Sequence, residues 1–233
     1  MGIKSQPEYE EMQTEPAATA AIEASTAIAK ASSGAVSTKV RNVSANAFSD
    51  KEGVFDIDTV EGLSMNAPRI KGEQGSLFQG TDDLGDAIHF ELISFNKRWA
   101  IGTGENDKEA KDYFKVSYDN VHLSGEATLI EDYIDSLKAQ GFSKANKSPY
   151  MDLWGFVIWS AKTGHIEPDM RQLACLQCSK TSMGAFTAFR ATRGIMEVKG
   201  LLKPIDVIEV HAEKRVSGTN KYTNYSFFAP KAK

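Results

Sequence analysis

Aromatic residues with lysine or arginine close by are the side chains of this sequence best suited to chemistry. The candidates are Lys97, Arg98, Trp99, Tyr113, Trp154, Arg190, Arg193, Lys214, Arg215, Lys221, Tyr222 and Tyr225. An unpaired polynucleotide exposes base faces and a line of phosphates. Aromatic rings stack on bases at roughly 1–3 kcal/mol each, and lysine and arginine neutralise phosphates. The pattern therefore predicts contact with a single-stranded nucleic acid.

Strand geometry decides which of these rings can be exposed. Successive side chains of a strand point to opposite faces, so one of two adjacent aromatics can be core while its neighbour is a platform. In the run 153–159 we expect one face to carry Leu153, Val157 and Trp159, and the other to carry Trp154, Phe156 and Ile158. Trp99, which follows Arg98 directly, is the best single candidate for stacking.

Cys175 and Cys178 have the C-x-x-C spacing of some metal and redox sites. A zinc site needs four ligands, and only His165 lies close upstream. On a strand, positions i and i+3 face opposite sides, and a redox pair opens a helix in a βαβ unit that is missing here. We therefore expect core thiols, no metal and no cofactor.

Catalytic sequence patterns are absent. The chain has no phosphate loop, no G-x-S-x-G and no H-E-x-x-H. Gly102-Thr103-Gly104 is a lone glycine-rich turn, and the pairs Asp82-Asp83 and Asp56-x-Asp58 fit solvated charge better than a metal site. The sequence predicts no catalytic residues.

Charge is unevenly divided along the 233 residues. The formal net charge is −4, but residues 1–85 carry a net of −6 (7 Lys/Arg against 13 Asp/Glu) and residues 171–233 a net of +7 (11 against 4). Such a division predicts an acidic arm and a basic working surface, with clustering for solubility as the alternative.

Targeting and membrane features are missing from the sequence. The segment from Met1 to Glu15 is polar and acidic, and no apolar run approaches the ~20 residues that span a bilayer. With only two cysteines, the chain is expected to be soluble, cytoplasmic and without a membrane partner.

Composition divides the chain into three parts. Residues 1–50 are rich in Ala, Ser, Thr and Glu and predict a disordered arm, because they cannot bury enough apolar surface. Residues 51–85 predict an extended lead-in, in which the alternation from Val54 to Asp58 favours an edge strand or a docking segment. Residues 86–230 predict the globular domain.

Strand patterns dominate the domain. We expect strands at 87–95, continuing over 97–102 past a bulge at Asn96, and at 113–118, 153–161, 171–179, 206–216 and 221–228. Apolar spacing predicts helices at 128–139 and from Thr181 to Val198, and Ser217-Gly218-Thr219-Asn220 predicts a hairpin turn. The fold class is mainly β: a closed or partly open barrel with one or two helices.

The C-terminal part resembles bacteriophage-type single-stranded DNA-binding proteins with an OB-like barrel. The resemblance covers roughly residues 67–230. It lies in Pro68–Gly72, the strand Leu173–Cys178, Ser179–Ser182, Phe186, Phe189, Gly200, the strand Val207–Val210, Lys214-Arg215, Gly218 and Lys221–Phe228.

The resemblance implies an OB-like barrel that coats single-stranded DNA during phage replication or recombination in the bacterial cytoplasm. It implies contacts through Trp99, Arg190, Lys214, Arg215, Lys221, Tyr222 and Tyr225. Such proteins often end in an acidic tail that recruits partners, whereas this chain ends in the basic segment Ala229–Lys233. The acidic arm from Glu8 to Glu15 would then recruit replication proteins.

A second hypothesis is a virion structural or decoration protein, a β-sandwich whose N-terminal arm threads into its neighbours. It predicts symmetric oligomers that are indifferent to DNA. An enzyme is a third hypothesis without a supporting set of residues. The sequence leaves the oligomeric state open, a homo-oligomer included, and gives no preference for DNA over RNA.

Overall fold

The computed structural model describes residues 47–104, 112–218 and 220–231, all within a compact unit that runs from Val43 to Lys233. The arm predicted over residues 1–50 lies outside the described residues up to 46. Residues 47–50 do not belong to an arm, because Ala47 and Phe48 are buried in the main core.

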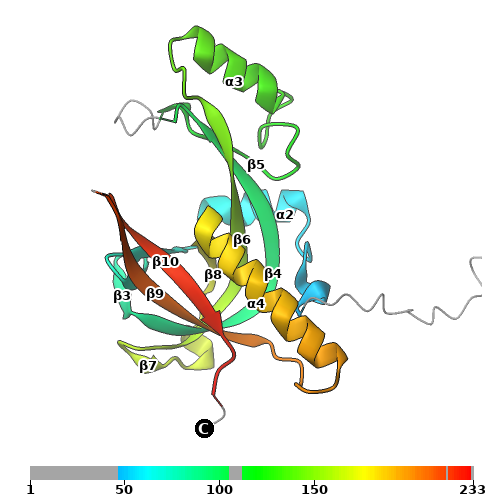
Figure 1. Cartoon of the computed structure of the whole chain (residues 1–233), viewed down its shortest axis with the longest axis vertical. Coiled ribbons are helices and arrows are strands. Elements are labelled where there is room, and N and C mark those ends of the chain that lie inside the picture. The colour runs from blue at the N-terminus through cyan, green and yellow to red at the C-terminus, as the bar shows by residue number, and fades with distance from the viewer. Residues whose placement is uncertain (1–46, 105–111, 219, 232–233) are drawn as a thin grey trace, which may run out of the picture. The chain divides into compact units, whose positions relative to one another are not determined.

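The described unit is mainly β, with three helices (Figure 1). The helices are α2 (Ile57–Asn66), α3 (Ile130–Ala139) and α4 (Lys180–Val198), with short 3₁₀ turns at Ser49–Lys51 and Pro168–Met170. The strands are β1 (Arg69–Glu73), β2 (Ser76–Gln79), β3 (Asp82–Gly85), β4 (Ala87–Gly102), β5 (Lys115–Ser117), β6 (Asn146–Ser160), β7 (Gly164–His165), β8 (Leu173–Cys178), β9 (Val207–Ser217) and β10 (Asn220–Phe228).

One sheet with the strand order β10-β9-β4-β6-β8-β1-β2-β3 curls into a half-barrel. The pairings along this order are antiparallel except that of β8 with β1, which is parallel. Strand β5 pairs with the far part of β4, and β7 with the end of β6.

Strand β10, at one end of the sheet order, approaches β1 and the β1–β2 turn without strand pairing among the described residues. The backbone N–H of Gly75 donates to Thr223 Oγ1 at 3.2 Å, and a Cβ on Gly72 would lie 2.6 Å from Thr223 Cγ2. Glycine at position 72 therefore permits the close approach of β1 to β10. A fully closed barrel is not confirmed, because the ladder stays open between these strands.

Apolar side chains on the inner face of the half-barrel form the main core, and α4 closes one end of it. Phe186 of α4 lies edge-on to Phe95 at a centroid distance of 5.5 Å and to Phe227 at 5.2 Å. The other core residues include Ile70, Leu77, Ile88, Phe90, Leu92, Leu153, Val157, Ala174, Leu176, Cys178, Ile208 and Val210.

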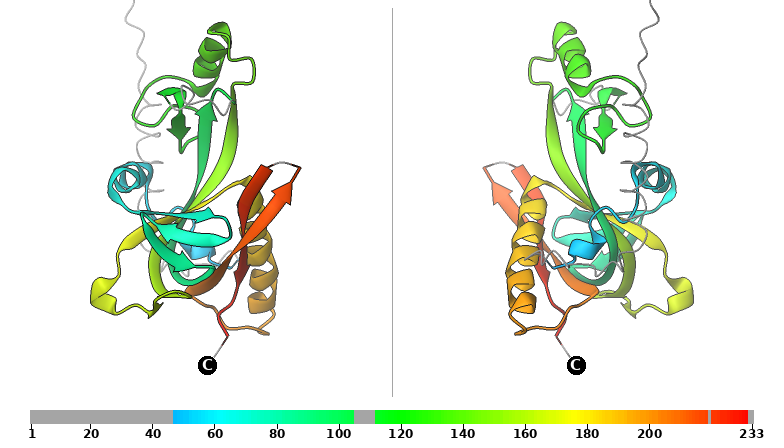
Figure 2. Two further views of the ribbon diagram at one scale, coloured as in Figure 1. Left: turned by 90° about the vertical axis from the view of Figure 1, so that its left-hand side faces the viewer. Right: turned by 90° about the vertical axis from the view of Figure 1, so that its right-hand side faces the viewer.

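A second, smaller core lies where β4 and β6 extend beyond the half-barrel and carry β5 and α3 (Figures 1 and 2). Ile130, Ile134 and Leu137 of α3 are buried there against Ile101 of β4. The spacing of these α3 residues is the helical pattern expected for 128–139, so that helix is confirmed.

Helix α2 covers the outer face of β6 and β8, and Figure 2 shows it on the opposite side of the sheet from α4. Its Val60 is fully buried with Trp154 of β6 and Cys175 of β8. The edge strand predicted from Val54 to Asp58 is wrong, because the Asp56 carboxylate accepts from the Thr59 N–H at 2.8 Å and caps a helix.

The expectation that residues 51–85 form an extended lead-in is also wrong. Besides α2, they supply β1, β2 and β3 of the main sheet. The hairpin of β9 and β10 and the helix α4 lie where they were expected. Strand β4 runs unbroken, and its pairing with β6 is irregular between His89 and Phe90 and between Leu92 and Ser94 instead of at Asn96.

Candidate nucleic-acid interface

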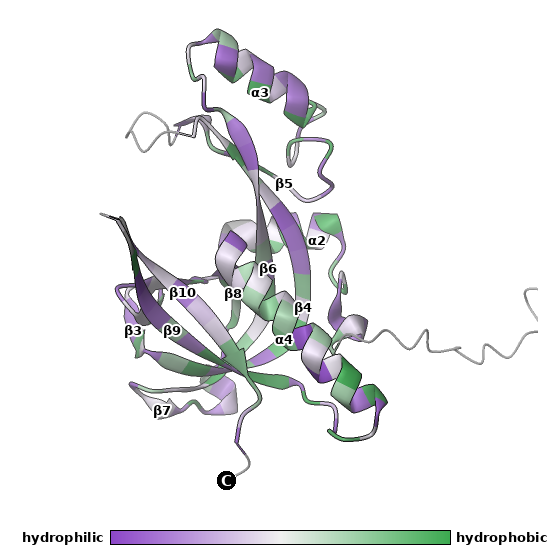
Figure 3. Cartoon of the chain, in the orientation of Figure 1, coloured by the Kyte–Doolittle hydropathy of each residue, from purple (hydrophilic) through white to green (hydrophobic). Residues whose placement is uncertain are grey.

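The hairpin of β9 and β10 presents four of the predicted contact residues at the surface. Lys214, Arg215, Lys221 and Tyr222 are all exposed, and Tyr222 lies opposite Arg215 in the strand register. The outer part of β9 is hydrophilic (Figure 3). Arg215 is ion-paired with Glu213 on its own strand, and Tyr222 exposes 44% of its surface. The hairpin can therefore offer cations and one ring to a ligand.

A second group of cations lies where β4, β6, β8 and β1 adjoin. Arg98 Nε donates to the Asp152 carboxylate at 2.9 Å, and both residues are buried. With its amide oxygen turned toward the guanidiniums, Gln177 accepts from Arg98 Nη2 at 3.0 Å and also from Arg69. We call Arg69, Arg98, Asp152 and Gln177 the guanidinium cluster. Its two cations and one carboxylate leave an excess of positive charge.

Neighbouring phenol rings line this cluster. The Arg98 guanidinium lies 5.3 Å from the ring centroid of Tyr150, a cation–π distance. The Tyr118 hydroxyl is 3.5 Å from Asp152 Oδ2, and burial together with this carboxylate raises the pKa of Tyr118 to about 12. Burial also raises the pKa of Asp152, against the guanidiniums of Arg98 and Arg69, which favour its charged form.

Strand β1 connects the guanidinium cluster with the β9–β10 hairpin. Arg69 lies at its start beside Cys175 of β8, and its glycines meet Thr223 of β10. Ile70 is fully buried while Lys71 is exposed, so Arg69 and Lys71 share the outer face. Arg69 and Lys71 therefore place two cations on the outer face of β1. On the hairpin, Lys214 and Lys221 lie on one face and Arg215 and Tyr222 on the other.

Four predicted contact residues are wrong for the protein as folded. Trp154 is fully buried beneath α2, so its ring cannot stack on a base. Tyr225 is buried in the main core, where burial raises the pKa of its hydroxyl. Arg190 and Arg193 of α4 are buried as well and have partners within the protein.

The partners of the two α4 arginines explain their burial. The Arg190 guanidinium lies 4.1 Å from the Phe95 ring centroid and pairs with Glu52 at 3.0 Å. Arg193 pairs with Glu197 one turn further along α4 at 2.7 Å. Arg190 therefore fastens α4 to the segment before α2, and Arg193 fastens the end of α4 by donating to the Lys203 carbonyl beyond the helix. Arg98 is likewise buried, but it belongs to the cluster that borders the surface.

Trp99 and Tyr113 are only partly buried, and both pack against the small core of α3. The Tyr113 ring lies 4.9 Å from that of Phe142, and the Tyr113 carbonyl accepts from the Tyr133 hydroxyl at 2.9 Å. The expected role of Trp99 as the best stacking platform stays a prediction, since part of its ring supports α3.

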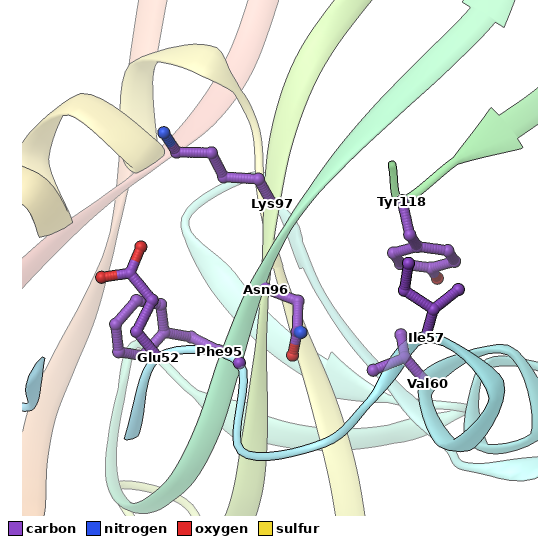
Figure 4. Close-up of a pocket in the computed structure, with 8 residues that line it drawn as sticks. Glu52, Ile57, Val60, Phe95, Asn96, Lys97 and Tyr118 are labelled. Carbon is purple, nitrogen blue, oxygen red and sulfur yellow. The ribbon is translucent and has the colours of Figure 1, made fainter. Parts of the chain in front are cut away.

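Lys97 is exposed on β4 beside a cavity of about 170 Å³ (Figure 4). Lys97, Phe95 and Glu52 lie on one side of β4 in this view, and Ile57, Val60 and Tyr118 on the other. The cavity therefore reaches under the start of α2.

Arg69 and Lys71 were not among the predicted contacts, although the sequence contained a signal for them. The alternation Arg69-Ile70-Lys71 is a strand pattern with two cations on one face. Pro68 and Gly72 on either side of it are equally typical of a loop, so the pattern is ambiguous in the sequence.

The two cysteines are free, buried and on opposite faces of β8, as expected. Cys175 belongs to the cluster beneath α2 and Cys178 to the main core. Burial raises the pKa of both thiols well above the ordinary value, which disfavours the thiolate form. Within the described ranges, no three His, Cys, Asp or Glu side chains are arranged to hold a metal ion.

Comparisons with known proteins identify no relative. No family model, no curated protein and no solved structure matches this chain. Among the described helices, none has the length and apolar character needed to cross a membrane.

Proposed function

We propose that this protein binds single-stranded DNA without marked sequence preference, as a coating protein of phage-type replication or recombination in the bacterial cytoplasm. The observation that carries the proposal is the set of cations formed by Arg98, by Arg69 and Lys71 on β1, and by the exposed β9–β10 hairpin. A cationic surface with a stacking ring is what an unpaired polynucleotide requires.

The strand connectivity supports an OB-like assignment. Strands β4, β6 and β8 form a meander, α4 follows, and β9 and β10 form a hairpin in which β9 pairs back with β4. This is the Greek-key order of a five-stranded OB barrel, with β1 inserted between β8 and β10. An OB barrel binds oligonucleotides on the face of its second and third strands, and β6 and β8 take these places here. It also binds through the loop between its fourth and fifth strands, which corresponds here to the turn between β9 and β10.

Binding is expected to weaken steeply with salt. If Lys71, Lys214, Arg215 and Lys221 each neutralise one phosphate, raising salt from 50 to 200 mM lowers the affinity about 50-fold, from a slope of roughly −0.7 per contact. Anisotropy of a labelled 30-nucleotide oligo-dT measures this, with a duplex of equal length as the comparison. No binding at 50 mM would remove the proposal and favour the virion structural role.

The hairpin cations are expected to account for a definable share of that salt slope. Replacing Lys214 and Lys221 together by alanine should reduce its magnitude by about 1.4, since two phosphate contacts are lost. The matched control is Lys162→Ala with Lys199→Ala, which removes the same charge from exposed positions beyond β6 and α4. An equal change in both double variants would mean that net charge, and not the hairpin, controls binding.

A further inference from the structure

The face of β6 and β8 that the proposed function requires is covered by α2. Val60 of α2 is fully buried against the cluster that contains Trp154 and Cys175. At the other end of the helix, Arg69 of the guanidinium cluster donates to the Ser64 carbonyl at 2.8 Å. A polynucleotide on this face would therefore meet the helix before it met the strands.

The start of α2 is packed less closely than the rest of the segment. Val54 and Ile57 expose 53% and 45% of their surfaces. The cavity of about 170 Å³ lies between Ile57, Val60 and β4 (Figure 4). The attachment depends on buried Val60, with Phe55, Leu63 and Ala67 partly buried beside it. Incomplete packing at the start of the helix permits local opening there.

Residues 52–66, which include α2, are acidic, as a polynucleotide is. Residues 52–66 contain four carboxylates, Glu52, Asp56, Asp58 and Glu61, and no lysine or arginine. Arg69 Nη2 donates to two neutral acceptors of α2, the Ser64 carbonyl oxygen at 2.8 Å and the Ser64 hydroxyl oxygen at 3.2 Å. A phosphate is a stronger acceptor for a guanidinium than a neutral oxygen. A bound strand therefore gains an interaction that α2 does not supply.

We propose that α2 is a displaceable acidic cover, which lies on the face of β6 and β8 in the free protein and leaves it when single-stranded DNA binds. This inference rests on the proposed function. Since α2 and the polynucleotide exclude each other, fixing α2 in place lowers affinity, and loosening it raises affinity.

A reversible cross-link tests the proposal in the full-length chain. Val60→Cys places a second thiol in the small cluster that contains Cys175, so mild oxidation can join α2 to β8. The oxidised variant is expected to bind labelled oligo-dT at least tenfold more weakly than the same protein after reduction. Wild-type protein treated identically is the control, because its two thiols lie on opposite faces.

A second pair of variants tests the opposite direction. Val60→Asp removes the buried contact of α2 and is expected to raise the affinity about fivefold and to speed amide exchange over 57–66. The matched control is Val54→Asp, which adds the same charge at an exposed position of the segment. It is expected to leave both quantities unchanged.

The outcomes separate this inference from the function on which it rests. Failure of wild-type and reduced Val60→Cys protein to bind the oligonucleotide would overturn the proposed function. Equal binding by the oxidised and reduced forms would leave that function standing and overturn the displaceable cover. Unchanged affinity together with unchanged amide exchange over 57–66 in Val60→Asp would also overturn it, because the loss of the buried Val60 contact would then not loosen α2.

Discussion

Replacing Asp152 by alanine is expected to lower the free energy of unfolding by about 3–5 kcal/mol. The carboxylate is fully buried and accepts from Arg98 at 2.9 Å, and Arg98 itself is buried. Removing one partner of such a pair leaves the other charge desolvated and uncompensated. Urea denaturation followed by circular dichroism gives the change as a shift of the midpoint at constant slope.

Two further substitutions serve as references for the loss of stability expected in Asp152→Ala. Asp152→Asn keeps a hydrogen-bond acceptor for Arg98 but removes the charge, so an intermediate loss is expected. Asp135→Ala removes the exposed partner of Lys138 on α3 and should change stability by less than about 0.5 kcal/mol. If Asp152→Ala cost no more than Asp135→Ala, the guanidinium cluster would not be a structural element of the sheet.

The long strands and the helices α3 and α4 could be predicted from the sequence because their signals are local. Apolar spacing at Ile130, Ile134 and Leu137 is enough to define α3, and period-two alternation is enough to place Leu153 and Val157 on the inner face. The turn between β9 and β10 could be predicted from the small and polar residues of its own sequence, Ser217-Gly218-Thr219-Asn220. These features do not depend on which segment packs against them.

The segment 51–85 could not be predicted in this way, because its elements depend on distant partners. Strand β1 has five residues, and it is held by a parallel pairing with β8, about a hundred residues further along the chain. Helix α2 has the same length as α3 but carries a weaker apolar stripe. Elements with so weak a local pattern are fixed by tertiary packing more than by propensity.

The wrong predictions in the candidate site arise because the sequence does not show which elements and partners cover each residue. Trp154 was correctly placed on the outer face, but without α2 that face looked exposed. Likewise, the sequence shows that Arg190 and Arg193 are cations near aromatics, but not that Glu52 and Glu197 neutralise them. Whether a side chain is exposed depends on which distant segments pack over it, and the pattern of a single sequence does not show this.

A methyl group added at Gly155 is expected to destabilise the protein by roughly 3 kcal/mol, because it would overpack a site that has no room for it. A Cβ at this position would lie 2.0 Å from the Glu91 carbonyl oxygen and 2.9 Å from a ring carbon of Phe90. Both obstacles belong to the paired strand β4, next to the irregularity between Leu92 and Ser94. The ladder itself would have to move.

The comparison for Gly155→Ala is Gly184→Ala in the exposed part of α4, where a Cβ meets nothing within 4 Å. That substitution is expected to stabilise the protein by about 1 kcal/mol, the helix propensity of alanine over glycine. Thermal unfolding of both variants would show opposite shifts of the midpoint. If the two glycines responded alike, the close approach of β4 and β6 at Gly155 would not exist in solution.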